Sequence, residues 1–292
     1  MVKKELYPFT SHFLDIDGQR LHYLDEGTGE PVLMLHGNPT WSFYFRNLVS
    51  ALRENYRVIV PDHIGCGLSD KPGDKLYDYT LKQRIDDIDH LLKALNIDSG
   101  ISLVLHDWGG MIGMGYAVRS PEKIKKIVLL NTGAFHLPPA KRFPFLLRIG
   151  RDTQVGAFLI RGLNAFVLLA ASVCPRKRLL KDVRDAYLAP YNSWKNRIAT
   201  LRFVQDIPLK SGDKCYDLVS EVQQNLHRFK STPVMLLWGM KDFVFDKHFF
   251  KKWLEFFPDA ETHAFENGGH YILEDEGPEC LDRIKEFLQK KK

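Results

Sequence analysis

Asp107 stands where a carboxylate can act on a substrate. It follows the short apolar run Ile101–Leu105, and glycines at 109, 110, 113 and 115 come soon after it. A strand, one polar residue and a glycine-rich helix start are typical of a nucleophile elbow, a strained turn that projects its central side chain. The usual occupant is Ser. A carboxylate there can instead attack an electrophilic carbon and form an ester with it. The alternative is that Asp107 only caps the following helix.

Two later residues complete a candidate triad with Asp107. Asp242 comes shortly after the apolar run Val234–Trp238, and His270 follows a pair of glycines. Nucleophile, acid and base in this order along the chain are typical of α/β-hydrolases. His270 would take a proton from the water that hydrolyses the ester, and Asp242 would orient the imidazole. The alternatives are a turn residue at 242 and a loop histidine at 270, neither with a catalytic role.

Displacement at carbon also needs hydrogen-bond donors for the departing anion. Asn38 offers a side-chain amide N–H and Trp108 offers an indole N–H. Both residues follow the ends of predicted strands, so their side chains are expected to face one cavity, with their backbone N–H groups as an oxyanion hole. The alternatives are an Asn in a turn before Pro39 and a Trp that serves only in packing.

The elements that must position these residues alternate between buried strands and helices. Apolar runs of strand type occur at Pro31–Leu35, Arg57–Val60, Ile101–Leu105, Ile124–Leu130 and Val234–Trp238. Helical periodicity covers Tyr79–Leu95, Lys247–Phe257 and the chain from Pro278, and a hairpin is expected around Asp17-Gly18. This alternation predicts an α/β fold with a mostly parallel central sheet flanked by helices. Because ligands bind at the carboxyl ends of such strands, the polar residues that follow them should converge: Asn38, Asp107, Asn131, Asp242 and His270.

Residues 136–211 differ in sequence pattern from the rest of the chain. Prolines interrupt short basic and apolar helical pieces, and strand-like runs are absent. We therefore expect an inserted helical cap at 136–211 and a core domain formed by 1–135 and 212–292. The apolar stretch Ala165–Val173 is too short to span a bilayer. The apolar segments Phe143–Leu147 and Phe166–Leu169 would suit long alkyl chains, but the sequence favours the alternative that they pack inside the cap.

The composition sets limits on partners and location. The 292 residues carry a net charge of +5. Much of the positive excess lies in Lys3-Lys4, Lys141–Arg161, Arg176–Lys181 and Lys290–Lys292, which are scattered rather than one stripe. This argues against a nucleic-acid partner and leaves open a weak affinity for an anionic surface. The four cysteines show no CxxC spacing, so we expect no zinc site and no disulfide framework. No signal peptide or integral membrane segment is visible, and we expect a cytoplasmic protein without a metal.

Several motifs resemble those of haloalkane dehalogenases. They are His36-Gly-Asn-Pro-Thr-Trp-Ser42, His106-Asp-Trp-Gly-Gly110, Gly239-Met-Lys-Asp242, Gly268-Gly-His270 and the cap string Tyr187-Leu-Ala-Pro-Tyr191. The resemblance covers nearly the whole chain. It implies an α/β-hydrolase fold with a helical cap, no cofactor, Asp107 as nucleophile, and Asn38 with Trp108 as the halide-stabilising pair. One branch of that family places its catalytic acid as Glu where this chain has Asn131, so the acid should be Asp242.

A closer resemblance concerns the substrate. Residues 61–72 (Pro-Asp-His-Ile-Gly-Cys-Gly-Leu-Ser-Asp-Lys-Pro) and 77–81 (Tyr-Asp-Tyr-Thr-Leu) resemble the third dehalogenase branch. Within it they are most similar to the β-lactone decarboxylases of bacterial long-chain olefin synthesis. Those enzymes keep the triad and the Asn/Trp pair, and convert a cis-β-lactone to an alkene and carbon dioxide. The resemblance implies a small apolar substrate, either a haloalkane or an alkyl β-lactone, and association with neighbouring pathway enzymes.

Two other functions remain as alternatives at this stage. An epoxide hydrolase shares the Asp elbow but needs two cap tyrosines, for which Tyr187 and Tyr191 are candidates. A catalytically silent binding protein of the same fold is the second alternative, and the complete triad argues against it.

Overall fold

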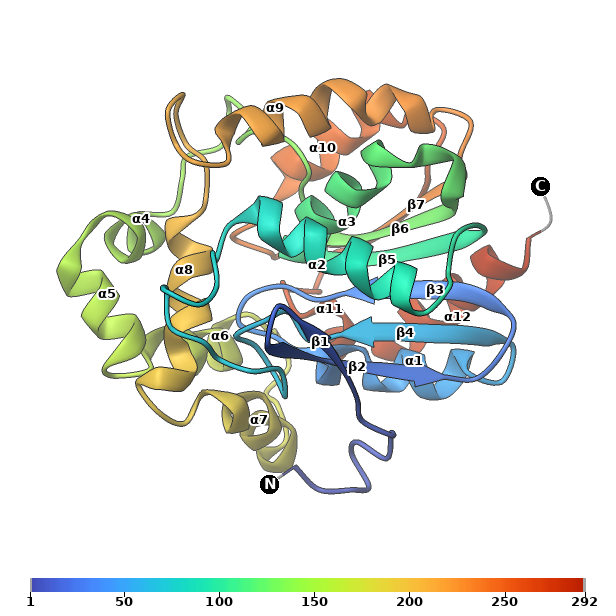
Figure 1. Cartoon of the computed structure of the whole chain (residues 1–292). Helices are drawn as coiled ribbons and strands as arrows, with labels where there is room; N and C mark the ends of the chain where they lie inside the picture. The colour runs from blue at the N-terminus through green and yellow to red at the C-terminus, as the bar shows by residue number, and fades with distance from the viewer. Residues whose placement is uncertain (1, 291–292) are drawn as a thin grey trace.

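The computed structural model describes residues 2–290 and forms an eight-stranded sheet in the order β1-β2-β4-β3-β5-β6-β7-β8 (Figure 1). Residues 1, 291 and 292, which the predicted core domain includes, lie outside the described part. The strands are β1 (His12–Ile16), β2 (Gln19–Glu26), β3 (Glu30–Leu35), β4 (Tyr56–Pro61), β5 (Ile101–Asp107), β6 (Ile124–Thr132), β7 (Val234–Gly239) and β8 (Glu261–Phe265). The six neighbouring strands β4-β3-β5-β6-β7-β8 pair in parallel, and the pairs β1–β2 and β2–β4 are antiparallel. The predicted fold class is confirmed.

The antiparallel edge begins with the predicted hairpin. Ile16 pairs with Gln19, so the loop holds only Asp17 and Gly18. Both have positive φ values, 51° and 79°. Two such residues form a turn whose twist matches that of the flanking strands.

Helices cover both faces of the sheet. Those of the core are α1 (Arg46–Leu52), α2 (Leu81–Ala94), α3 (Trp108–Arg119), α9 (Tyr216–Asn225), α10 (Lys247–Phe256), α11 (Ile272–Asp275) and α12 (Gly277–Gln289). Alternate side chains of β3 belong to two hydrophobic clusters, one on each face of the sheet. Leu33 and Leu35 pack with α2, α3, α9 and α10, whereas Val32 and Met34 pack with α1 and α12. This follows from side chains alternating across a strand.

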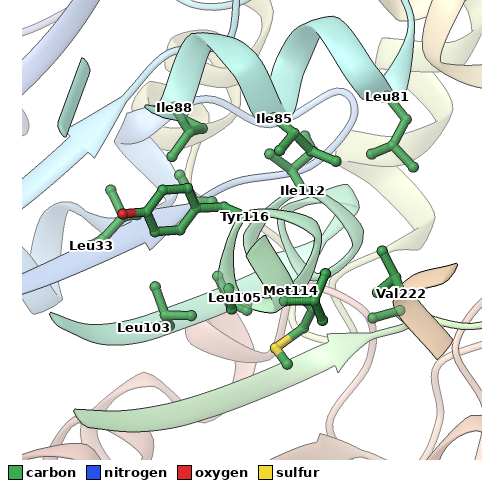
Figure 2. Close-up of a cluster of buried hydrophobic side chains, with 14 of the residues drawn as sticks. Leu33, Leu81, Ile85, Ile88, Leu103, Leu105, Ile112, Met114, Tyr116 and Val222 are labelled. Atoms are coloured by element: carbon green, nitrogen blue, oxygen red, sulfur yellow. The ribbon is translucent and has the colours of Figure 1, made fainter. Parts of the chain in front are cut away.

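Helix α2 shows how the sequence pattern becomes packing. The side chain of Thr80 accepts a hydrogen bond from the backbone N–H of Gln83 and caps the helix start. Leu81, Ile85 and Ile88 repeat at helical spacing and are fully buried. Figure 2 shows these three side chains pointing toward α3 and the strands beneath it.

A group of helices, which we call the cap, lies beyond the carboxyl ends of the strands (left in Figure 1). It comprises α4 (Phe145–Asp152), α5 (Gln154–Arg161), α6 (Ala165–Val173), α7 (Lys181–Leu188) and α8 (Ile198–Gln205). All are inserted between β6 and β7, and no strand is assigned to residues 133–233, all of which are described. The division into domains at 136 and 211 stays a prediction.

The lengths and composition of the helices bear on whether one could cross a membrane. Across residues 2–290, none is both long and apolar enough to do so alone. Helices α5 and α6 reach that length and composition only together, and they are bent by 71° relative to each other.

Candidate active site

Asp107 ends β5 and immediately precedes α3, in the strained turn that the sequence predicts. Its φ is +52° and its ψ is −124°, a conformation that residues other than glycine rarely adopt. The surroundings leave no room for larger neighbours. A Cβ at Gly37 would collide with the Asp107 side chain, and one at Gly109 would collide with the carbonyl oxygen of Leu35. The glycines therefore let two loops close tightly around one carboxylate.

The three residues of the predicted triad lie together. His270 Nδ1 is 2.7 Å from Asp242 Oδ2, and His270 Nε2 is 3.6 Å from Asp107 Oδ2. All three side chains are buried, each less than one-tenth exposed. The second distance exceeds a direct hydrogen bond, so the imidazole edge faces the carboxylate with a gap between them. The roles assigned to these residues remain predictions, but the geometry that the roles require is present.

Asn131 holds Asp242 in place. The sequence predicted that Asn131 would lie near the site but did not indicate this role. Its side-chain amide donates to Asp242 Oδ2 at 3.0 Å and to the carbonyl oxygen of Gly239 at 3.0 Å. The other carboxylate oxygen of Asp242 accepts from the backbone N–H groups of Val244 and Phe245. Four donors thus fix this carboxylate when the imidazole is included. Asn131 has a φ of +33°, which an Asn tolerates better than most residues.

Backbone donors converge on the other side of Asp107. The N–H of Asn38 donates to Asp107 Oδ1 at 2.6 Å, and the N–H of Trp108 is also directed at this carboxylate. Oδ1 therefore accepts from the Asn38 N–H, while Oδ2 faces His270. The predicted oxyanion hole has this arrangement, because a tetrahedral centre at the Asp107 carboxyl carbon would place negative charge on Oδ1.

The two predicted leaving-group donors line the same cavity as Asp107. Asn38 already uses its amide, which donates to the carbonyl oxygen of Thr200 in cap helix α8 at 3.1 Å. Its side-chain oxygen is buried and has no partner among the described residues. The indole ring of Trp108 packs against Phe203 of the same cap helix, at 5.2 Å between ring centroids. Contacts with α8 therefore hold both side chains.

Buried polar residues anchor the loop that carries Asn38. The N–H of His63 donates to His36 Nε2 at 3.1 Å, and His63 Nε2 lies 3.0 Å from the carbonyl oxygen of His36. Asp62 accepts from the backbone of Ser42 at 2.7 Å and lies 2.8 Å from His22 Nδ1. These residues tie the ends of β3 and β4 together and so fix the position of the Asn38 backbone.

Burial and charge shift the titration of the triad in defined directions. Burial alone would lower the pKa of His270, but the charge and hydrogen bond of Asp242, with Asp107 adding to them, raise it above 6.5. Burial raises the pKa of Asp107 above 3.8, although His270 and the N–H groups of Asn38 and Trp108 oppose this. Because the two carboxylates favour the imidazolium, His270 becomes a neutral base only at a higher pH than a free histidine.

A cavity of about 630 Å³ opens in front of Asp107, between the sheet edge and the cap. Every residue of α4, α5 and α6 that lines it is apolar or glycine. Phe143, Phe145, Leu146, Phe166 and Leu169 are among these lining residues of the cap region. The cap helices pack on one another, yet both apolar segments also present side chains to the cavity. Packing inside the cap, which the sequence favoured, therefore does not account for all of their apolar residues.

The tyrosines required by the epoxide-hydrolase alternative are engaged elsewhere. The hydroxyl of Tyr187 donates to Glu274, and that of Tyr191 donates to the carbonyl oxygen of Thr40 at 3.1 Å. Neither residue lines the cavity. Within residues 2–290, no cluster of three or more His, Cys, Asp or Glu side chains has the geometry to hold a metal ion, and all four cysteines are free and buried.

Comparisons with known proteins agree with this architecture. The family model of the α/β hydrolase fold matches residues 30–277. A cis-3-alkyl-4-alkyloxetan-2-one decarboxylase of Shewanella oneidensis is 59% identical over 284 residues, which covers 97% of this chain and 89% of the relative. The chain belongs to the α/β-hydrolase family. Within it, a haloalkane dehalogenase of Mycolicibacterium paratuberculosis is a more distant relative, 30% identical over 98% of this chain and 94% of its own.

A solved structure extends the comparison to the fold. A haloalkane dehalogenase variant from Agrobacterium tumefaciens C58 superposes with a TM-score of 0.87, covering 99% of this chain and 100% of its own at 22% identity. This likeness shows the fold alone. Together, the relatives confirm the resemblance to haloalkane dehalogenases and to β-lactone decarboxylases, and neither they nor this structure supports the epoxide-hydrolase or silent-protein alternatives.

Proposed function

We propose that this protein opens a cis-3,4-dialkyl β-lactone through Asp107 and releases an alkene and carbon dioxide. The observation that carries the proposal is the placement of Asp107: its Oδ1 accepts from the backbone N–H of Asn38, and its side chain lines an apolar cavity. The relative with 59% identity is named for decarboxylation of an alkyl-substituted oxetan-2-one, which is a β-lactone. This name supports a ring oxygen as the leaving group in preference to a halide.

In the proposed first step, a carboxylate oxygen of Asp107 attacks ring carbon C4, and the bond from C4 to the ring oxygen breaks. The ring oxygen leaves as part of a carboxylate that stays attached to C3, so an ester to Asp107 and a free carboxylate form together. Asn38 and Trp108 line the cavity beside Asp107 and would donate to that carboxylate.

In the proposed second step, the bond from C3 to the carboxylate carbon breaks and releases carbon dioxide. Its electron pair forms the double bond between C3 and C4, and the bond from C4 to the Asp107 oxygen breaks. Asp107 regains its charge, and no water or proton is consumed. Inversion at C4 followed by elimination of the two groups from opposite sides converts a cis-lactone to a cis-alkene.

Hydrolysis of the ester would require His270 as a base, whereas decarboxylation would not. Removal of the ester by water needs a base, which the His270–Asp242 pair would supply. Water attack on the intermediate would give a 3-hydroxy acid from the lactone, or an alcohol from a haloalkane. Decarboxylation needs no base, so His270 contributes there through its charge beside Asp107.

The test offers a long-chain cis-β-lactone and a brominated alkane of matched length side by side. We expect cis-alkene and carbon dioxide from the lactone. In His270→Ala, we expect the brominated alkane to leave a stable ester on Asp107, seen by mass spectrometry, while alkene release persists. Release of bromide without any alkene from the wild-type protein would overturn the proposal and leave the dehalogenase function.

The pH dependence provides a second readout of the same proposal. Because the pKa of His270 is raised above 6.5, the neutral base is lost as the pH falls through that value. Ester hydrolysis after bromide release should therefore decline with a midpoint above pH 6.5. Alkene release should persist below that midpoint, until protonation of Asp107 stops the first step. Single-turnover rates across pH 5–9 would separate the pH dependence of ester hydrolysis from that of alkene release.

Two further parts of the proposal rest on resemblance to olefin-forming enzymes. We propose association with neighbouring pathway enzymes and a cytoplasmic location. Co-purification of this chain with enzymes that make long-chain β-lactones, from cells that express both, would support the first of these.

A further inference from the structure

The mouth of the cavity is surrounded by apolar side chains that face water. Six residues both line the cavity and are more than one-third exposed: Phe145, Leu146, Leu159, Leu169, Val173 and Phe243. We call them the rim. Phe145 and Leu146 are 73% and 72% exposed, although they begin a helix that would be expected to bury its apolar residues. Exposed apolar clusters of this kind mark surfaces that bind something.

The apolar surface extends beyond what a substrate in the cavity would cover. Val155, Phe158, Leu163 and Leu168 are also exposed, and none of them lines the cavity. They belong to α5, α6 and the turn between them, adjacent to the rim. Figure 1 shows α4 and α5 at the outer end of the cap, farthest from the sheet. Substrate binding accounts for the rim but not for these four residues.

Positive charge concentrates in the same segment. Residues 141–181 contain nine of the 41 basic residues and only one of the 36 acidic residues. The segment therefore carries +8, more than the +5 of the whole chain, and the remainder is net negative. Arg148, Arg176 and Arg178 are exposed, and none forms an ion pair with any residue in the described range 2–290.

An exposed aromatic residue lies at the edge of this surface. Trp194 is 50% exposed, and the guanidinium of Arg161 lies 4.5 Å from its ring centroid. Phe158 is its nearest aromatic neighbour on α5, at 6.5 Å between ring centroids. Tryptophan beside arginine is typical of the boundary between lipid headgroups and acyl chains.

We propose that the rim, the adjoining apolar residues of α5 and α6, and the arginines around them form a docking surface for an anionic phospholipid bilayer. Apolar side chains next to basic ones are the pattern of segments that lie in a membrane interface. The cavity mouth would then open into the acyl chains. An apolar substrate would enter from the bilayer and an apolar product would return to it, without crossing water.

A lipid surface fits this position better than a protein does. The rim residues are the exposed part of the cavity lining, so a protein bound over them would obstruct the opening there, whereas mobile acyl chains would not. The unpaired arginines favour phosphate headgroups, since each basic residue near an anionic surface strengthens binding by about 5-fold. The proposal does not depend on the leaving group, and binding can be measured without turnover.

The experiment measures co-sedimentation of the full chain with vesicles of phosphatidylcholine, alone or with about one-third phosphatidylglycerol. We expect binding to the anionic vesicles that weakens as salt rises, and much weaker binding to neutral ones. Arg148→Gln with Arg178→Gln should weaken binding by about 25-fold, from two charges at about 5-fold each. The matched control, Lys230→Gln with Lys251→Gln, removes two exposed charges from the core and should change binding less than 2-fold.

A second matched pair tests the apolar contribution. Phe158→Ser should weaken binding by about 10-fold, because a phenyl ring no longer enters the acyl chains. Phe13→Ser removes a phenyl ring of similar exposure, 46% against 55%, from strand β1 of the core and should have no effect. Turnover of a short, water-soluble brominated alkane should be unchanged in all four variants, which shows that they fold.

Two outcomes would overturn the proposal. One is an affinity for anionic vesicles that none of these variants changes, or no affinity at all. The other is self-association of the chain that Phe158→Ser abolishes in the absence of lipid, which would make this face a protein interface. Either result would leave the proposed decarboxylation untouched, because alkene release can be measured with lactone dispersed in detergent, in the absence of any bilayer.

Discussion

The carboxyl edge of the sheet and the cap enclose one cavity but contribute opposite kinds of side chain. At the sheet edge, Asp242 receives hydrogen bonds from Asn131, Val244 and Phe245 as well as facing His270. The cap helices α4 to α6 supply only apolar residues and glycine, several of them exposed to water. From this difference we infer a division that the following predictions test: the sheet edge would determine the rate of chemistry, and the cap would determine which molecules reach it.

Loss of the nucleophile should have the largest effect, and it tests the sheet edge directly. In Asp107→Ala, we expect alkene and bromide release to fall on the order of 10⁴-fold or more, since no other group can form the ester. Product assays under single-turnover conditions would measure this, with circular dichroism as the control for folding. Retained turnover would show that the chemistry lies elsewhere in the molecule.

Loss of a leaving-group donor should come next. In Asn38→Ala, the amide N–H disappears while the backbone N–H that contacts Asp107 remains. We expect the first step to slow by about 100- to 1000-fold, as for removal of one oxyanion donor. Rapid-quench measurement of bromide release isolates that step. An unchanged first step would mean that Trp108 suffices or that Asn38 serves only to hold α8.

Asn131→Asp probes the support behind the triad. The variant keeps the shape of residue 131 but removes its donor and adds a negative charge beside Asp242. More negative charge favours the imidazolium, so the pKa of His270 should rise and the acid limb of ester hydrolysis should move to higher pH. A movement of about one pH unit lowers hydrolysis about 10-fold on the acid side. A fall in rate without movement of the limb would indicate general distortion.

Substitutions in the cap should change the KM for a substrate more than kcat, and these effects should be the smallest. Phe166→Ala removes a cavity-lining ring, so KM for a long-chain lactone should rise about 10-fold, while kcat changes less than 3-fold. Leu168→Ala, on the same helix but outside the cavity, is the matched control. A larger effect on kcat than on KM would contradict the division between sheet edge and cap.

The sequence predicted the sheet edge well because its signals are local. A buried strand is a short apolar run, so the sequence placed Asp107 and Asp242 at strand ends, and the glycine pair before His270 singled out that residue. The structure brings the three together, and their roles remain predictions. The strand β8 was missed because its residues alternate in burial and its sequence, Glu-Thr-His-Ala-Phe, is hardly apolar. Helices α1 and α9 were also missed. Helix α1 has only seven residues, whereas α9 does show helical spacing, with Val219 and Val222 buried on one face, and this signal was overlooked.

Contacts between distant parts of the chain could not be predicted. The hydrogen bond from Asn131 to Asp242 spans 111 residues, and that from Asn38 to Thr200 spans 162. Nothing in the local pattern around Asn131 or Thr200 signals a partner. The direction of the cap side chains was also beyond the sequence, because an apolar helix has the same pattern whether it faces a core, a cavity or lipid.

The hydrogen bond between Asn38 and Thr200 has a consequence for protein engineering. It joins the loop after β3 to helix α8 through a backbone carbonyl, so the insertion is not an independent module that can be exchanged at will. In a chimera that receives the cap from a relative, the Asn38 amide will keep its position only if the grafted helix places a backbone carbonyl where that of Thr200 now lies. Grafts should therefore be chosen by the path of that backbone before their side chains are considered.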